Sequence, residues 1–191
     1  WYSGHPSKSE ARAHFNIPDS DYVYLYFGAI RPYKGLEKLI ETFKQLPNGR
    51  LIIAGKPHNA QVESLIRQLS EEDSRISLHL SFIPDQMVTH FFSCADAVVL
   101  PFTDVLTSGS AILALSLGKP VIAPTIGCLP ELIMGSAGLL YDDENPEGLK
   151  DALINVRLQQ YHPEEIRGSM MENYDWLEIA KLYRGPYGAV N

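Results

Sequence analysis

Little in this sequence is typical of a disulfide scaffold, a metal site or a membrane span. Two of the 191 residues are cysteines, Cys94 and Cys128, and without a CxxC spacing they are interpreted as reduced thiols in apolar surroundings. The six histidines form no HxxxH or similar cluster, so no metal site is predicted. No apolar run approaches the length that crosses a bilayer, and no signal peptide pattern is present. We therefore expect a cytoplasmic protein that holds no metal.

Positive charge is also scarce. Lys and Arg number 16 against 23 Asp and Glu, which gives a formal net charge of −7 at pH 7. Nucleic acids and anionic membranes bind basic surfaces, so no general nucleic-acid binding is expected. A small, locally basic pocket for one phosphate group remains compatible with this charge. The chain begins with Trp1 rather than Met, and we expect it to be a piece of a longer polypeptide.

What the sequence does contain is a regular alternation of short apolar runs and amphipathic segments. With 45% hydrophobic residues, a chain of this length suits one domain with a sizeable core. The expected strands are 22–27, 50–54, 76–80, 97–100, 121–123 and 138–141. The expected helices are 7–15, a segment from 36 to the turn at 47–49, 60–70, 85–92, one within 107–117, 131–134 and 145–156. This alternation predicts an α/β fold, a Rossmann-like doubly wound parallel sheet that binds ligands outside the carboxyl ends of its strands.

Three parts are expected along the chain. Residues 1–20 form a leading segment with one short helix, and residues 21–160 form the ligand-binding domain. Residues 161–191 form a helical tail, which carries Trp176, Ile179, Leu182 and Tyr183 on one side.

One loop at the predicted ligand edge, residues 28–35, combines glycine with two cations. Gly28 frees the backbone for close approach to a ligand. Arg31 is able to bind phosphate oxygens through two N–H groups, and Lys34 acts as a point charge. The alternative is that both cations are ordinary solvated loop charges.

A second loop at the same edge ends in the small polar turn Ser108-Gly109-Ser110, directly before an apolar helix. Backbone N–H groups at a helix N-terminus lack partners, and the helix dipole there favours an anion. The alternative is that Ser108 merely caps the helix. A cationic loop and an amide-rich helix start on one sheet edge together predict a clamp for a diphosphate.

Several short motifs follow one another in order between about residues 22 and 156. They are Phe27-Gly28-Ala29-Ile30-Arg31-Pro32-Tyr33-Lys34-Gly35-Leu36, Leu51-Ile52-Ile53-Ala54-Gly55, Ala95-Asp96-Ala97-Val98-Val99-Leu100-Pro101, Gly118-Lys119-Pro120-Val121-Ile122-Ala123, Leu129-Pro130-Glu131-Leu132-Ile133 and Gly138-Leu139-Leu140. With these motifs the sequence resembles the C-terminal, donor-binding domain of GT-B glycosyltransferases, in particular the large retaining family 4, the group 1 glycosyltransferases. In that family the closing helix, here the tail around Trp176, crosses back to a partner domain.

The resemblance implies roles for individual residues. Lys34 contacts the donor diphosphate with help from Arg31, and the Ser108-Gly109-Ser110 turn offers amides and hydroxyls to the distal phosphate. Phe82, Ile83 and Leu113 fall where family members line the base and ribose pocket. For Phe82, simple core packing is an equal alternative.

The sequence also departs from the family pattern. Two glutamates with seven residues between them usually engage the transferred sugar and the ribose, and here those positions are Val105 and Leu113. Each charge-assisted hydrogen bond lost in this way is worth about 1.5–3 kcal/mol. Asp104 adjoins the first position and is the candidate catalytic or sugar-contacting residue, while Glu131 is the next carboxylate after the helix. Where the family often has arginine the chain has Ala29, so Arg31 either substitutes for it or points elsewhere.

The resemblance thus implies a glycosyltransferase donor domain. It would bind a nucleoside-diphosphate sugar, with no cofactor and no metal, for retaining transfer of a hexose-type unit in polysaccharide biosynthesis. The acceptor would be held by an absent N-terminal domain, so the isolated piece is expected to transfer nothing. Peripheral membrane association through that absent half stays open, at the cytoplasmic membrane face.

Two other functions stay open beside this one. The first is a degenerate GT-B module that has kept the fold and lost the chemistry, as Val105 and Leu113 suggest. The second is a GT-B epimerase or phosphorylase. These enzymes share the clamp but lack the sequence motifs found here at residues 30–35 and 118–123. The sequence does not identify the donor base, the sugar, the acceptor or the oligomeric state.

Overall fold

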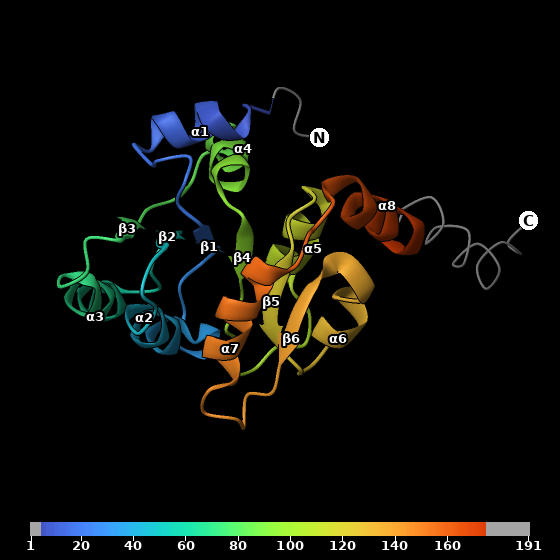
Figure 1. Cartoon of the computed structure of the whole chain (residues 1–191). Coiled ribbons are helices and arrows are strands. Elements are labelled where there is room, and N and C mark those ends of the chain that lie inside the picture. Colours follow the sequence, from blue (N-terminus) through green and yellow to red (C-terminus); the bar gives the residue numbers. More distant parts are fainter. Residues whose placement is uncertain (1–4, 175–191) are drawn as a thin grey trace, which may run out of the picture.

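A computed structural model describes residues 5–174 of the chain. Its centre is one parallel sheet of six strands in the order β3-β2-β1-β4-β5-β6 (Figure 1). The strands are β1 (Val23–Phe27), β2 (Arg50–Ala54), β3 (Ile76–His79), β4 (Ala97–Val99), β5 (Val121–Pro124) and β6 (Gly138–Tyr141). The strand order reverses between β1 and β4, where doubly wound sheets bind their ligands. The predicted fold class is confirmed.

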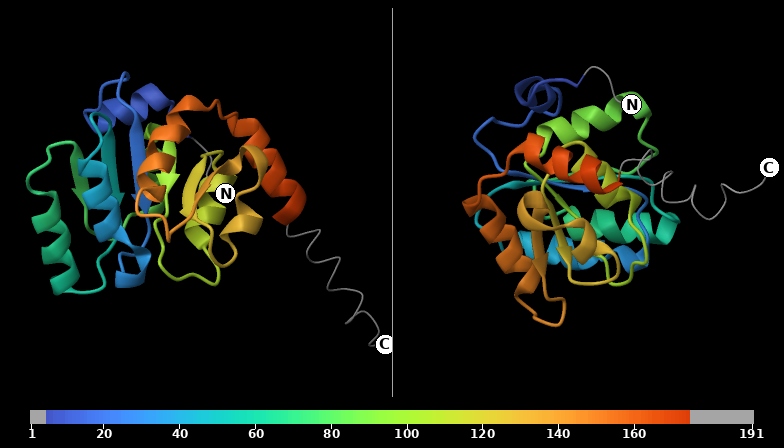
Figure 2. Two further views of the ribbon diagram at one scale, coloured as in Figure 1. Left: turned by 60° about the horizontal axis from the view of Figure 1, so that its bottom comes forward. Right: turned by 90° about the vertical axis from the view of Figure 1, so that its right-hand side faces the viewer.

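Helices cover both faces of this sheet (Figure 2). The described helices are α1 (Lys8–His14), α2 (Leu36–Lys44), α3 (Ala60–Ser70), α4 (Asp85–Cys94), α5 (Gly109–Ser116), α6 (Leu129–Leu132), α7 (Gly148–Asn155) and α8 (Pro163–Tyr174), with short 3-10 turns η1 (Pro32–Lys34), η2 (Gly135–Ala137) and η3 (Val156–Leu158). One core cluster lies under α1, α4, α5, α6 and α8, and a second lies under α2, α3 and α7. The central strand β1 is buried on both faces, which explains its uninterrupted apolar sequence.

The leading helix α1 is attached to the domain through a buried cation. Arg12 is 1% exposed, and its Nη2 atom lies 2.7 Å from Oδ2 of Asp96 at the start of β4. The same carboxylate accepts a hydrogen bond from the backbone N–H of Val23 at 2.7 Å and pairs with Lys8 at 2.5 Å. Arg12 also donates to the backbone oxygens of Cys94 and Asp19. One carboxylate therefore joins the leading helix, β1 and β4.

Most expected elements occur within two residues of their predicted bounds, and β2, α3 and β6 match at both ends. Two helices differ. The expected helix at 131–134 is α6, which begins at Leu129 because Pro130 is tolerated in a first helical turn, where its missing N–H is not needed. The expected helix at 145–156 begins only at Gly148, because residues 142–147 form turns. Of the expected tail, α8 is described, whereas Trp176, Ile179, Leu182 and Tyr183 lie outside the described residues.

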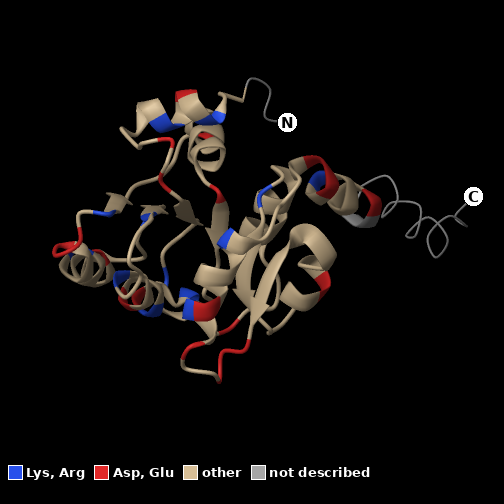
Figure 3. Cartoon of the chain, viewed as in Figure 1, with Lys and Arg blue, Asp and Glu red and all other residues tan. Residues whose placement is uncertain are grey.

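Charged residues lie on many elements (Figure 3). The loop between β6 and α7 is acidic, and its Asp143 pairs with Lys38 of α2 at 2.8 Å. Both cysteines are free. In the part of the chain that the structure describes, no helix has the length and apolar character needed to cross a membrane.

Candidate functional site

The two loops singled out in the sequence meet at the carboxyl edge of the sheet. A Cβ atom built on Gly28, directly after β1, would lie 2.8 Å from Oγ of Ser110 and 3.6 Å from Nζ of Lys34. The ammonium and the hydroxyl therefore flank the same bare stretch of backbone. Gly28 has φ +134°, which other residues rarely adopt, and a side chain here would also fill the space between the two groups. The structure therefore brings Lys34 and the turn before α5 together.

Close backbone contacts hold these two loops in register. Gly35 ends the η1 turn in the left-handed conformation with φ +64°, and a Cβ there would lie 1.8 Å from the carbonyl oxygen of Pro101. Thr103, two residues further, donates to the carbonyl oxygen of Tyr33 from its backbone N–H at 2.9 Å and from its hydroxyl at 3.1 Å. The position of Lys34 relative to the second loop is thus fixed by backbone on both sides.

Lys34 is a half-buried cation with an aromatic neighbour. Its Nζ atom lies 4.9 Å from the ring centroid of Phe102. Burial lowers the pKa of Lys34 from its usual value, and the nearby positive charge of Arg31 lowers it further. Within residues 5–174 no carboxylate forms an ion pair with Lys34. A partly desolvated cation without a counter-charge is well placed to bind an anionic ligand.

Arg31 is exposed on the same loop. Its effect on the pKa of Lys34 places the two cations near one another. No hydrogen bond of the Arg31 guanidinium occurs within the described part of the chain, so all its donors face solvent or a ligand.

The start of α5 combines a cap with unpaired amides. The hydroxyl oxygen of Ser108, which is 4% exposed, accepts a hydrogen bond from the N–H of Ala111 at 3.1 Å, so its capping role is confirmed. The N–H groups of Gly109 and Ser110 have no partner among the described residues. The Ser110 hydroxyl lies beside Gly28, where the positive end of the helix dipole adds to the charge of Lys34.

The three residues predicted for a base and ribose pocket differ in burial. Phe82 follows β3 and is 74% exposed, so the alternative that it packs in the core is wrong. Ile83 and Leu113 are half-buried and pack against the same core cluster. The edge therefore offers one exposed ring and two adjoining apolar side chains of the core.

The carboxylates near the site take no part in its hydrogen bonding. Asp104 is exposed on the loop after β4, and the neighbouring Val105 is half-buried. A Cβ on Gly127, after β5, would lie 1.9 Å from the carbonyl oxygen of Val105, so a third loop closes against this one. Neither Val105 nor Leu113 has a side chain that accepts a hydrogen bond.

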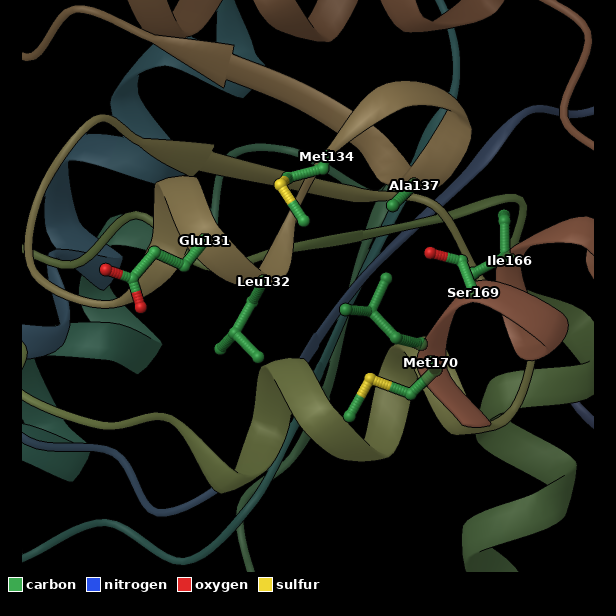
Figure 4. Close-up of a pocket in the computed structure, with 8 residues that line it drawn as sticks. Glu131, Leu132, Met134, Ala137, Ile166, Ser169 and Met170 are labelled. Carbon is green, nitrogen blue, oxygen red and sulfur yellow. The ribbon is translucent and has the colours of Figure 1, made fainter. Parts of the chain in front are cut away.

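Glu131, the next carboxylate in the sequence, lies at a small pocket between α5, α6 and α8 (Figure 4). The Glu131 carboxylate points away from the methionines that line the pocket. The pocket has a volume of about 10 Å³, which leaves room for no more than one water. Glu131 also has an interaction within the protein. It lies in the first turn of α6, where the positive end of the helix dipole favours a carboxylate.

Sequence reasoning missed two residues of this site, Phe102 and Thr103. Phe102 lies under the Lys34 ammonium, and Thr103 fastens the loop that carries Tyr33. Both follow Pro101 in the loop already singled out, but only their cross-loop contacts reveal what they do. Among residues 5–174, no group of three His, Cys, Asp or Glu side chains is arranged to hold a metal ion.

The comparisons with known proteins agree with this geometry. Residues 7–173 match the family described as "Glycosyl transferases group 1". GDP-mannose:glycolipid 4-beta-D-mannosyltransferase of Xanthomonas campestris pv. campestris is 37% identical over 169 residues, which are 85% of this chain and 47% of the relative. The chain therefore spans about half the length of that curated relative.

Solved structures show the same fold. HepE of Anabaena in complex with UDP and glucose has a TM-score of 0.81 and 19% identity over 96% of this chain and 52% of that one. The C-terminal domain of the group 1 glycosyltransferase LpcC of Francisella tularensis has a TM-score of 0.69 and 19% identity, over 91% of this chain and 94% of that one. With a family match that spans nearly all the described residues, this chain belongs to the group 1 glycosyltransferases and has the Rossmann-like fold of a GT-B half.

Proposed function

We propose that this domain binds the diphosphate of a nucleoside-diphosphate sugar and supports transfer of the glycosyl unit. The observation that carries the proposal is that Lys34 and the Ser110 hydroxyl meet at Gly28. They lie next to the start of α5, where the N–H groups of Gly109 and Ser110 have no partner among the described residues. All of these groups donate hydrogen bonds. Lys34 carries a full positive charge, and the two N–H groups lie at the partly positive end of the helix dipole. A diphosphate supplies the acceptors and the negative charge that such a set requires.

In glycosyl transfer the bond between the sugar and the distal phosphate breaks, and negative charge grows on the departing diphosphate. Donors that are already oriented toward that oxygen stabilise the charge as it develops. Lys34 and the α5 amides would do this on the distal phosphate, while Arg31 adds a second cation from the loop. In this proposal the domain's own cations and amides stabilise the leaving group without a resident metal or cofactor.

The remainder of the donor would lie along the same edge. Phe82 offers an exposed ring to a nucleobase, with Ile83 and Leu113 forming an apolar floor for base and ribose. Asp104, exposed beside Val105, is our candidate for contact with the transferred sugar. The similar proteins named above differ in base, GDP-mannose in one and UDP in another, so the shared chemistry is the diphosphate.

A second half of the protein would complete the site. Tyr33, Phe82, Leu106 and Ile112 are large exposed hydrophobic residues on the loops or first helical turn at the carboxyl edge. Leu106 is 85% exposed at the tip of the loop before α5. Apolar side chains gathered around a polar site are typical of a surface that another domain covers. We propose that the acceptor is held by that other half, N-terminal in the full protein.

Calorimetric titration of the 191-residue chain with GDP, UDP and ADP tests the clamp. We expect saturable binding of at least one diphosphate, weakened roughly tenfold to a hundredfold in Lys34→Ala by loss of a charge-assisted hydrogen bond. Lys150→Ala, at a lysine paired with Glu147 on α7, is the matched control and should leave binding unchanged. Equal binding by wild type and Lys34→Ala, or none at millimolar ligand, overturns the proposal.

A second candidate function is a binding module without transfer chemistry. The apolar side chains of Val105 and Leu113 favour it, because neither accepts a hydrogen bond from a sugar or ribose hydroxyl. The full-length protein distinguishes the two. Transfer of a labelled sugar excludes the binding module. Nucleotide binding without sugar transfer, in a protein that gains transfer activity in Val105→Glu, supports it.

A further inference from the structure

A second cationic region lies at the opposite, amino edge of the sheet. It is a groove of about 640 Å³ between the starts of α1 and α8 and the ends of α4 and α5. Its polar lining includes His5, Lys8, Lys119, Arg167 and the hydroxyl residues Ser93 and Ser116. In Figure 1, α1 lies against α4, and α5 lies against α8. Because the strands are parallel, this edge is separated from Gly28 and Lys34 by the length of the sheet.

Lys119 is the most deeply placed cation of this groove. It precedes β5, and its Nζ atom donates to the carbonyl oxygen of Ala95 at 2.8 Å. Burial lowers the pKa of Lys119 to about 8, although the charge of Asp96 opposes that shift. No carboxylate lies within ion-pair distance of Lys119 among residues 5–174. Two of its three N–H donors therefore have no hydrogen-bond partner in the described part of the chain.

The nearby carboxylates are already engaged elsewhere. Glu164 pairs with Arg167 at 2.5 Å, and Asp96 is shared by Lys8, the buried Arg12 and the N–H of Val23. Among residues 5–174, Lys8, Arg12, Lys119 and Arg167 therefore lie near two carboxylates, those of Asp96 and Glu164. Four cations near two carboxylates give a local excess of positive charge in a chain whose formal net charge is −7.

Arg167 lies directly over Gly118 at this groove. A Cβ on Gly118, which has φ +70°, would lie 2.7 Å from Nη1 of Arg167 and 2.8 Å from the carbonyl oxygen of Pro163. The guanidinium donates to the carbonyl oxygen of Leu117 at 3.5 Å and pairs with Glu164, which holds it over the turn between α5 and β5. A cation positioned in this way loses less conformational entropy when it binds a ligand than one on a free side chain does.

We propose that this groove binds the phosphate group of a phosphorylated ligand. Lys119 and the hydroxyls of Ser93 and Ser116 would hold the phosphate, while Lys8 and Arg167, each paired with a carboxylate, add positive charge along the lining. Its volume falls in the range of small-molecule sites, which is roughly 300–1,000 Å³. The phosphate belongs either to a soluble molecule or to a lipid headgroup, and both present the same acceptors. The site is separate from the diphosphate clamp and does not depend on it.

Nuclear magnetic resonance of the ¹⁵N-labelled chain, titrated with inorganic phosphate, tests the groove. The Lys34→Ala background removes the main cation of the clamp, so the amide signals of Ser116, Leu117 and Lys119 report on the groove. We expect saturable shifts of these signals. Ser116→Glu places a negative charge in the groove at an exposed position and should weaken phosphate binding about tenfold or more. Ser64→Glu, at an exposed position of α3, is the matched control.

Two further arms sharpen the test. Lys119→Met should abolish the phosphate-induced shifts. If Lys119→Met does not fold, the effect of Ser116→Glu on phosphate binding tests the proposal instead. Vesicles of phosphatidylcholine with and without phosphatidylglycerol distinguish the source of the phosphate. Binding of inorganic phosphate alone indicates a soluble ligand, and co-sedimentation only with the anionic vesicles, lost in Ser116→Glu, indicates a headgroup. Shifts confined to Gly109 and Ser110, or equal effects of Ser116→Glu and Ser64→Glu, overturn the proposal.

Discussion

The two edges of this sheet use positive charge in different ways. At the amino edge Arg12 and Lys8 are bound to Asp96, and Arg167 is bound to Glu164. At the carboxyl edge Lys34 has an aromatic ring and another cation as neighbours, with no carboxylate paired to it in residues 5–174. A cation that is bound to a carboxylate holds the fold together. One that is partly buried and left unpaired is available to a ligand, and by this criterion Lys119 resembles Lys34 more than it resembles Arg12.

The largest effect should come from breaking the paired cations. Asp96→Ala leaves the buried Arg12 without its carboxylate, and we expect the unfolding free energy to fall by about 3–5 kcal/mol. Urea denaturation measures this change. Glu63→Ala, which breaks an exposed pair with Arg67 on α3, is the control and should cost only about 0.3–0.5 kcal/mol. Similar losses in the two variants would show that Asp96 has no special structural role.

The next largest effect concerns the carboxyl edge. Gly35→Ala introduces a Cβ in the left-handed region and against the carbonyl oxygen of Pro101, so the loop of Lys34 must shift. We expect a loss of about 2 kcal/mol or more in unfolding free energy, together with loss of diphosphate binding. Gly168→Ala, in α8, is the matched control, because a Cβ there meets nothing within 4 Å. Undiminished nucleotide affinity in Gly35→Ala would contradict the fixed register of the two loops.

A third test compares pH dependence between the wild type and Lys119→Met. The folded-state pKa of Lys119, about 8, lies below the unfolded value of 10.5, so the unfolded chain binds the proton more tightly. The unfolding free energy contributed by this group therefore rises between about pH 8 and 10.5, by on the order of 2 kcal/mol, and is flat below that window. Denaturation at pH 7.5 and 9.5 should show a smaller rise in Lys119→Met. Identical slopes would mean that the lysine is not desolvated.

The smallest effect is expected from His79, at the end of β3. Burial lowers the pKa of His79 below its usual value, and His14 lowers it further. The folded state therefore loses stability as the pH falls below about 6.5 and His79 begins to charge in the unfolded chain. Because the ring is half-buried, the loss should stay under about 1 kcal/mol. His79→Gln should reduce the difference between thermal midpoints at pH 7 and pH 5.

The sequence predicted the sheet and its helices because local signals agreed with the fold. Asn59 accepts a hydrogen bond from the N–H of Val62 and begins α3 at the expected residue, and the turn at 47–49 separates α2 from β2. The early start of α6 has a local cause as well, since Pro130 fits the first turn of a helix, where its missing N–H is not needed.

The side-chain contacts and exposure at the two edges of the sheet could not be predicted from the sequence. Parallel pairing predicts that the loops after β1 and β4 share an edge, but their distance depends on the contact between Gly35 and Pro101. The exposure of Phe82 depends on what surrounds it in space, and an aromatic residue after a strand fits core and surface equally well. The groove around Lys119 combines segments from residue 5 to residue 167, so no single stretch of sequence indicates it.

The shared carboxylate of Asp96 also bears on how such a domain is best excised for expression. Fragments that start at β1 would keep the whole sheet but lose α1. Asp96 would then lack the Arg12 guanidinium, and the face of α4 that packs against α1 would be exposed. An expressed fragment of this domain should therefore begin at or before Ser7, which caps α1, and not at the first residue of β1.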